Sequence, residues 1–166
     1  MVTHILLIEG VGLDSAESLS PHLEHLDYQF LTAITPEAAA QQIAGYWPDL
    51  IVLNCSDVFF LDPDWIVNKN ILKIPLIVVG NKEGFKGEFP PDTIVVATHH
   101  PQQLAQVVRR AISEMRPRFI RLPGLALNSH TRQILCDGQI HSLTPKEFQL
   151  LRLLMSQPNQ IVVRKR

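Results

Sequence analysis

The chain has 166 residues, of which 46% are apolar and 19% are charged, and its formal net charge is −1. This composition is typical of a protein with a packed core, and it excludes a disordered or coiled-coil chain. The near-neutral charge conceals an asymmetry. Residues 1–115 hold six basic and fourteen acidic side chains, whereas residues 116–166 hold nine basic and two acidic ones. The change of sign near Arg116 predicts two parts, of which the second is a candidate for contact with a polyanion.

Membrane, export and metal signals are missing from the sequence. No apolar run reaches the ~18 residues that cross a bilayer, and the start Met-Val-Thr-His lacks the basic region of a signal peptide. We therefore expect a soluble, cytoplasmic protein with no membrane partner. Cys55 and Cys136 stand outside any C-x-x-C pair, so neither a disulfide framework nor a zinc site is expected.

Short apolar runs alternate with helix-like segments over residues 1–115, the pattern of a parallel sheet with helices on both faces. Five runs are predicted strands: His4 to Ile8, Tyr28 to Thr32, Leu50 to Leu53, Leu76 to Val79 and Thr93 to Ala97. The third to fifth runs are continuously apolar, which indicates strands buried on both faces.

The segments between these runs open on helix start signals, a capping side chain or a proline at the first helical position. The signals are Asp14 with Glu17, Thr35-Pro36 before Glu37 to Tyr46, Asp62-Pro63 before a segment ending near Leu72, and His100-Pro101. Pro21 lies inside the first helix, which is therefore kinked or starts late. The last helix has a predicted buried stripe of Leu104, Val107, Val108, Ala111 and Ile112. Residues 81–92 contain two glycines and two adjacent prolines, which predict a loop or a single turn instead of a helix.

The second part follows a linker at residues 116–118 and begins with a predicted hairpin. Its strands are Arg132 to Cys136 and Gln139 to Ser142, joined by Asp137-Gly138 in a type I′ turn. A helix should then start at Thr144 as N-cap, with Pro145 at the first position and Glu147 completing a capping box. The helix is expected to stop at Gln157-Pro158. Its predicted buried face consists of Phe148, Leu151, Leu154 and Met155.

These motifs resemble a known family along nearly the whole chain. Residues 1–115 resemble the receiver domain of a bacterial response regulator, through Ile-Leu-Leu-Ile-Glu at the first strand, Pro48-Asp49-Leu-Ile-Val-Leu at the third, Ile74-Pro75-Leu-Ile-Val-Val at the fourth and Pro101-Gln-Gln-Leu104 at the last helix. Residues 119–163 resemble the front half of a winged-helix effector domain of the OmpR-like class, most specifically through Leu143-Thr-Pro-Lys-Glu-Phe148 after the Asp-Gly hairpin.

The resemblance implies a fold and a division into domains. Residues 1–115 should form a flavodoxin-like (CheY-like), doubly wound, five-stranded parallel sheet with the fourth helix short or missing. Residues 119–166 should form a small β-hairpin plus helix, an incomplete winged helix.

The resemblance also implies a chemistry whose residues can be checked one by one. In receivers a carboxylate after the third strand accepts a phosphoryl group, and it holds Mg²⁺ together with an acidic pair after the first strand. A hydroxyl after the fourth strand and a Lys after the fifth bind the phosphoryl oxygens. The corresponding residues are Asn54, Glu9-Gly10, Gly80 and Ala97. An amide cannot form an acyl phosphate and one carboxylate holds Mg²⁺ poorly, so we expect a degenerate pseudo-receiver that has no catalytic residue, metal or cofactor and is not an enzyme.

Alternative chemistry at the same sheet edge has weaker support. Asp57 is a possible nucleophile, but it lies three residues past the strand end. Cys55 could form a dyad with His99 or His100, but their strands are not neighbours in this fold, and a free Cys more often packs as a small apolar side chain.

Two further groups could bind ligands. His22 and His25 could share a helix face as half of a metal site, although two ligands without a third rarely hold an ion. The aromatic residues Phe59, Phe60 and Trp65 could line a small-molecule site in the former phosphorylation pocket, although a packing role is favoured.

The basic second part suits DNA phosphate contact, for which the candidates are Arg132, Lys146, Arg164, Lys165 and Arg166. The chain stops where the recognition helix of a winged helix should follow, so DNA is an expected partner only if that domain is completed beyond Arg166. A homodimer is expected through the helix that follows Pro101, which Val108→Glu or Arg109→Glu would test. The sequence thus favours an atypical, phosphorylation-independent response regulator that regulates transcription when intact. The alternative is a stand-alone protein-interaction or small-ligand-sensing module.

Overall fold

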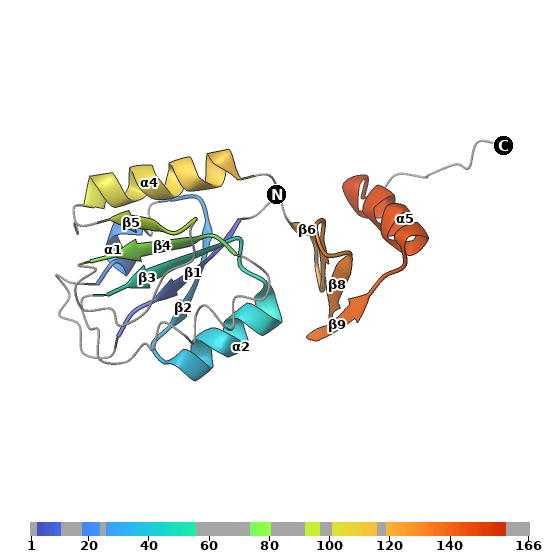
Figure 1. Ribbon diagram of the computed structural model, residues 1–166, viewed down its shortest axis with the longest axis horizontal. Helices are drawn as coiled ribbons and strands as arrows, with labels where there is room; N and C mark the ends of the chain where they lie inside the picture. The colour runs from blue at the N-terminus through green and yellow to red at the C-terminus, as the bar shows by residue number, and fades with distance from the viewer. Residues whose placement is uncertain are drawn as a thin grey trace. The chain divides into compact units, whose positions relative to one another are not determined.

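The computed structural model describes residues 3–10, 18–23, 26–55, 74–80, 92–96, 101–115 and 119–158. The chain divides into two compact units, residues 2–115 and residues 116–166. Each unit is built on its own sheet (Figure 1).

The sheet of the first unit has five parallel strands in the order β2-β1-β3-β4-β5. They are β1 (His4–Ile8), β2 (Gln29–Ala33), β3 (Leu50–Asn54), β4 (Leu76–Val79) and β5 (Ile94–Val96). This is the flavodoxin-like order, and it confirms the expected fold class. Continuous burial holds for β3 and β4, but it is wrong for β5, where Ile94 is exposed because this strand lies at the edge of the sheet.

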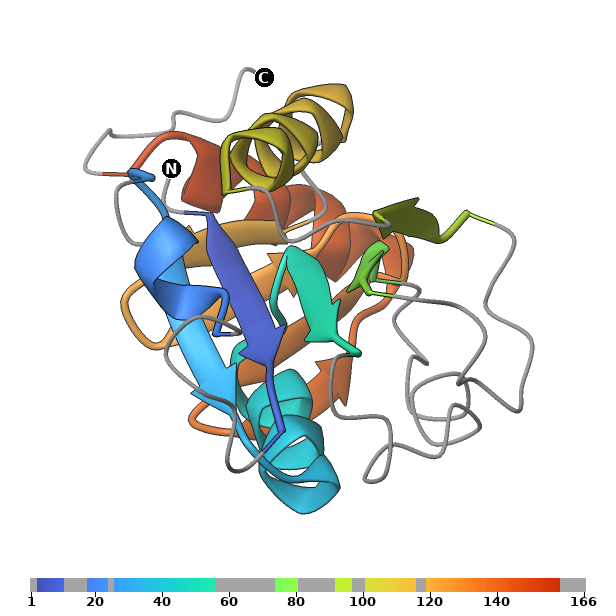
Figure 2. The ribbon, with the colours of Figure 1, turned by 90° about the vertical axis from the view of Figure 1, so that its left-hand side faces the viewer.

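Three helices of the first unit are described, and they lie on opposite faces of the sheet (Figures 1 and 2). They are α1 (Ser20–Leu23), α2 (Pro36–Tyr46) and α4 (Pro101–Glu114). As predicted, Thr35 caps α2, its hydroxyl accepting the Ala38 N–H at 3.2 Å. Pro21 is the second residue of α1. Of the two expected alternatives, a kinked helix or a late start, the structure shows the late start.

Three of the predictions for the first unit fall in segments that the structure does not describe. The start signals Asp14 with Glu17 and Asp62-Pro63 lie there, as does almost all of the connection between Gly80 and Thr93. The expected shortening or loss of the fourth helix therefore stays a prediction.

Alternate strand residues build two apolar cores, one on each face of the sheet. Ile5, Leu7, Leu50, Val52, Ile77 and Val79 pack with Leu19 and Leu23 at α1 and with Leu104, Ala105, Val108 and Ala111 of α4. Leu6, Ile8, Ile51, Leu53, Leu76 and Val78 pack with Ala39 and Ile43 of α2. The predicted stripe of α4 is confirmed: Leu104, Val108 and Ala111 are buried, and Val107 and Ile112 are partly buried.

In its described residues, 119–158, the second unit is a four-stranded antiparallel sheet followed by one helix. Its elements are β6 (Phe119–Leu122), β7 (Leu125–Asn128), β8 (Gln133–Cys136), β9 (Gln139–Ser142) and α5 (Pro145–Ser156). The predicted turn between β8 and β9 is confirmed, with φ of 49° at Asp137 and 76° at Gly138. Sequence reasoning missed the β6–β7 hairpin, although Pro123-Gly124 is a turn dipeptide and Gly124 has a φ of 75°.

The start of α5 agrees with its sequence signal in detail. The Thr144 N–H donates to Glu147 Oε2 at 2.8 Å, and the Glu147 N–H donates to Thr144 Oγ1 at 3.4 Å, which completes the capping box. The hydrogen bond from the Thr144 N–H lowers the pKa of Glu147. Phe148 and Met155 pack on the sheet as expected. Leu154 was wrongly assigned to the buried face, because its side chain is 44% exposed.

Among the described helices, none combines the length and apolar character that a membrane span requires.

Candidate functional site

The carboxyl edge of the parallel sheet brings Glu9 and Asn54 together. Glu9 directly follows β1, and its N–H donates to Ala33 O at 3.1 Å. Asn54 ends β3, and its side chain is 1% exposed. Because β1 and β3 are neighbours, with Ile8 opposite Leu53, the two side chains meet across adjacent strands. Asn54 Nδ2 donates to Glu9 Oε1 at 3.3 Å.

Three further donors reach Glu9 from the segment that leads into α1. Ser18 Oγ donates to Glu9 Oε2 at 3.0 Å, and Ser20 Oγ donates to the same oxygen at 3.3 Å. The Leu19 N–H donates to Glu9 Oε1. Both carboxylate oxygens thus accept protein hydrogen bonds. This set of residues, Glu9 with Ser18, Leu19, Ser20 and Asn54, is called the Glu9 clasp below. Sequence reasoning identified Glu9 and Asn54 but not the two serines, which lie outside any motif.

The Glu9 clasp does not fit the Mg²⁺ that the resemblance implies. Mg²⁺ requires near-octahedral oxygen ligands and is usually held by one or two carboxylates in addition to water. The side chain of Asn54 turns an N–H donor toward Glu9, and the oxygens of Glu9 are engaged by four donors. In the part of the chain that the structure describes, no three His, Cys, Asp or Glu side chains gather in an arrangement that could bind a metal.

Gly80 follows β4 at the same edge and has a backbone that only glycine adopts easily. Its φ is +126°, and its N–H donates to Val96 O at 2.9 Å. A Cβ built at this position would lie 3.2 Å from Cys55 Cβ, closer than ordinary van der Waals contact. Gly80 therefore lacks the hydroxyl expected at this position, and its backbone conformation also disfavours any side chain there.

Cys55 follows Asn54 in the chain, lies next to Gly80 and is a packed, protonated thiol. It is 4% exposed and belongs to the core on the α2 face of the sheet. Burial raises the pKa of Cys55 to about 12. A nucleophilic cysteine needs a lowered pKa, because the thiolate is the reactive form. The geometry at Cys55 thus favours the packing role over the nucleophilic one.

Several candidate residues lie outside the described part of the chain. Among them is Ala97, the position expected for the receiver lysine. The others are His25, Asp57, Phe59, Phe60, Trp65, His99 and His100. Gly10 is described and directly follows Glu9, while His22 belongs to α1.

Two of the proposed DNA contacts are described, and both are exposed cations of the second unit. Arg132 precedes β8 with a left-handed φ of 56°, and its carbonyl accepts the Leu143 N–H at 2.9 Å. Lys146 is the second residue of α5. The bond from Leu143 joins the turn before β8 to the segment that leads into α5. Arg164, Lys165 and Arg166 lie outside the described residues.

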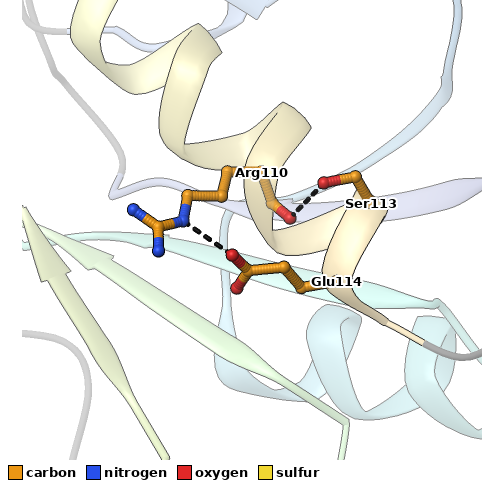
Figure 3. Close-up of polar contacts among 3 residues, drawn as sticks. All are labelled: Arg110, Ser113 and Glu114. Carbon is orange, nitrogen blue, oxygen red and sulfur yellow. Dashed lines mark hydrogen bonds and ion pairs between the residues drawn. The ribbon is translucent and has the colours of Figure 1, made fainter.

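The outer face of α4 is polar and holds an ion pair. Arg110 Nε lies 2.7 Å from Glu114 Oε1, and Ser113 Oγ donates to the Arg110 carbonyl at 2.8 Å (Figure 3). Arg109 is also exposed. Val108, by contrast, is fully buried in the core, so its replacement does not probe the helix surface as the sequence suggested.

Comparison with known proteins gives a consistent result. No family model matches the chain. It is 24% identical to the phosphate regulon transcriptional regulatory protein PhoB of Shigella flexneri over 177 residues, which cover 99% of this chain and 77% of that protein. The structure of the response regulator DrrB, an OmpR/PhoB homologue from Thermotoga maritima, has a TM-score of 0.50 and 14% identity, covering 98% of this chain and 76% of DrrB.

A second solved structure comes from a family described as redox sensors in the streptococci that evolved from two-component response regulators. Its TM-score is 0.50 and its identity 20%, covering 96% of this chain and 76% of that one. At these identities the two structures show a shared fold.

Proposed function

The chain is a relative of the OmpR/PhoB response regulators, and we propose that it is a cytoplasmic signal-transduction protein that works without phosphorylation. The observation that carries this proposal is the hydrogen bond from Asn54 Nδ2 to Glu9 Oε1. In the receivers that the chain resembles, carboxylates occupy both positions and together hold Mg²⁺. Here Asn54 is neutral and donates a hydrogen bond directly to the carboxylate of Glu9.

Two further features support the same proposal. The side-chain amide of Asn54 is neutral and lacks the anionic carboxylate oxygen that could attack a phosphoryl group, and Gly80 has a backbone that disfavours a hydroxyl-bearing side chain. With Mg²⁺ not fitting the clasp, neither the nucleophile nor the charge neutralisation that phosphoryl transfer requires is supplied. We extend the proposal to the absence of enzymatic activity, since Cys55, a reactive side chain type at this edge, is buried and protonated.

Incubation of the full chain with acetyl phosphate and Mg²⁺ is expected to leave its mass unchanged. Intact-mass spectrometry reads out any phosphoryl adduct, and a receiver with an intact phosphorylation site serves as the positive control in the same buffer. An adduct would contradict the proposal. Its loss in an Asp57→Asn variant would then identify Asp57 as the nucleophile.

DNA binding forms the second half of the proposal. The unit of residues 116–166 is strongly basic, with nine basic and two acidic side chains, and Arg132 and Lys146 are exposed on it. Its helix α5 is apolar on two sides. Phe148 and Met155 pack on the sheet, whereas Leu150, Leu153 and Leu154 are 59%, 43% and 44% exposed. We propose that further effector-domain structure covers these three leucines in the intact regulator.

Binding of the present chain to DNA is expected to be weak, independent of sequence and dependent on salt. Fluorescence anisotropy with two unrelated duplexes should give dissociation constants within about threefold of each other, because phosphate contacts carry no sequence information. Arg132→Ala and Lys146→Ala should each reduce the slope of log K against log salt by about 1. Arg110→Ala, which removes a charge paired with Glu114 in the other unit, should leave the slope unchanged.

The alternative function is a stand-alone protein-interaction or ligand-sensing module without DNA binding. It is supported by the same replacements at the phosphorylation positions, Asn54 and Gly80. No binding of either duplex at low salt, or binding whose salt slope is unchanged by Arg132→Ala and Lys146→Ala, would favour this alternative.

Association into a homodimer through α4 is also proposed. The exposed Arg109 and the Arg110–Glu114 pair present charges of both signs on one helix surface, which a twofold contact can satisfy mutually.

A further inference from the structure

We infer that the Glu9 clasp has become a fixed structural tie, in which Asn54 positions Glu9 and Glu9 holds the start of α1 against the sheet. This edge of the sheet would thereby set how α1 packs against α4. The inference concerns the role of the residues that remain, and it does not depend on the proposed absence of phosphorylation.

The hydrogen bonds of the Glu9 clasp all point toward the carboxylate of Glu9. Three of the four donors to Glu9 come from residues 18–20, and the fourth comes from Asn54, 45 positions away along the chain. Glutamate has several rotatable bonds, and ordering such a side chain costs entropy. The donor from Asn54, which is buried at the end of β3, fixes Glu9 Oε1 at the point where it accepts the Leu19 N–H.

Helix α1 is too short to be stable as an independent element. It has four residues, Ser20–Leu23, and begins with a serine followed by a proline. A helix this short cannot repay its own nucleation cost in water. Its placement must therefore come from tertiary contacts, which are the Glu9 clasp at its start and the burial of Leu19 and Leu23 beneath it.

The start of α1 and helix α4 share one apolar core. Leu19 and Leu23 are fully buried in the same core as Leu104, Ala105 and Val108, and α1 packs against α4. Packed side chains transmit displacement because protein interiors leave little free volume. Loosening of residues 18–20 should therefore be felt at the inner face of α4, the helix whose outer face we propose as the dimer contact.

Amide hydrogen exchange measured by NMR on the full chain tests this inference. In Asn54→Ala, exchange at the Leu19 amide should be about tenfold faster, the size expected when a hydrogen bond to a charged group is lost. The amides of Ala105 and Val108 should exchange measurably faster, while those of Ile77 and Val78 in β4 should change by less than about twofold. A role limited to general stability would accelerate all of these amides equally.

Two variants keep the test decisive. Glu9→Gln preserves the shape of the side chain and removes its charge, and it should reproduce the pattern of Asn54→Ala. The double variant should add little to either single one, because both act on one contact. Asn128→Ala, which removes an equally buried asparagine that caps a turn of the other unit, should leave Leu19 unchanged. An unchanged Leu19 amide in Asn54→Ala, or a uniform rise across β4 and α4, would overturn the inference.

Discussion

Val108→Glu is expected to unfold the parallel-sheet unit at neutral pH. Val108 is fully buried among the apolar side chains of the core beneath α4, with Leu104 and Ala111 on the same helix face. The substitution removes a packed side chain and places a carboxylate among buried apolar side chains. The free energy of unfolding should fall by more than about 4 kcal/mol, which is a large part of the stability of a domain of this size.

The loss should depend on pH in a defined direction. Burial raises the pKa of the introduced carboxyl in the folded state above its ordinary value of about 4.3. The folded state then binds more protons than the unfolded state, so the free energy of unfolding decreases as the pH rises through this range and is partly restored toward about pH 4. Circular dichroism at neutral pH and at about pH 4, with urea titration wherever the unit is folded, measures the difference. Equal stability of Val108→Glu and the unchanged chain would show that Val108 is not a core residue.

Arg109→Glu is the matched surface variant on the neighbouring position. Arg109 is exposed, so the substitution should change the free energy of unfolding by about 0.5 kcal/mol or less. If α4 forms the proposed dimer contact, sedimentation should show a weaker association of this variant at unchanged stability. Unaltered association would place the dimer contact elsewhere.

Gly80→Ser should destabilise the parallel-sheet unit, although it restores the side chain type that receivers carry after the fourth strand. The φ of +126° at this position is unfavourable for any residue with a Cβ and costs about 1–3 kcal/mol. The added Cβ would also lie 3.2 Å from Cys55 Cβ, so that the neighbouring backbone or side chain must shift. Thermal and urea unfolding measure the total loss.

Two companion variants serve as controls, one for the thiol of the neighbouring Cys55 and one for glycine replacement as such. Cys55→Ala retains a Cβ, so combining it with Gly80→Ser should recover little of the loss. Gly45→Ala is the control for glycine replacement. Gly45 lies within α2 and a Cβ there meets no atom within 4 Å, so this substitution should stabilise the unit by about 0.5–1 kcal/mol. An unchanged stability of Gly80→Ser would contradict the strained conformation at Gly80.

Local signals in the sequence predicted local structure well, and the reason is visible in particular residues. Thr144, Pro145 and Glu147 form the capping box that their spacing indicates, because all of its donors and acceptors lie within four consecutive residues. Asp137-Gly138 makes the expected turn because both residues tolerate positive φ. The predicted strands also appear to within one or two residues at each described end, since apolar runs of that length suit a doubly wound sheet.

Predictions that depended on tertiary packing, such as which side of a helix is buried, were wrong or incomplete in two places. Leu154 matches the period of the buried face of α5 but is exposed, because the single sheet beneath the helix covers only part of its circumference. The β6–β7 hairpin was missed because Arg121 and Pro123 interrupt the apolar pattern, while pairing with β8 completes the sheet.

The amino-acid order alone established the class of sheet, the positions of Glu9, Asn54 and Gly80 at strand ends, and the basic character of residues 116–166, because each of these follows from local pattern or composition. Folding settled what the residues at the strand ends do. Ser18, Leu19 and Ser20 reach Glu9 from 9 to 11 positions away, and Asn54 reaches it from 45. Such contacts arise from the pairing of β1 with β3 and from the packing of α1. Neither can be read from the residue types at Glu9 and Asn54 themselves.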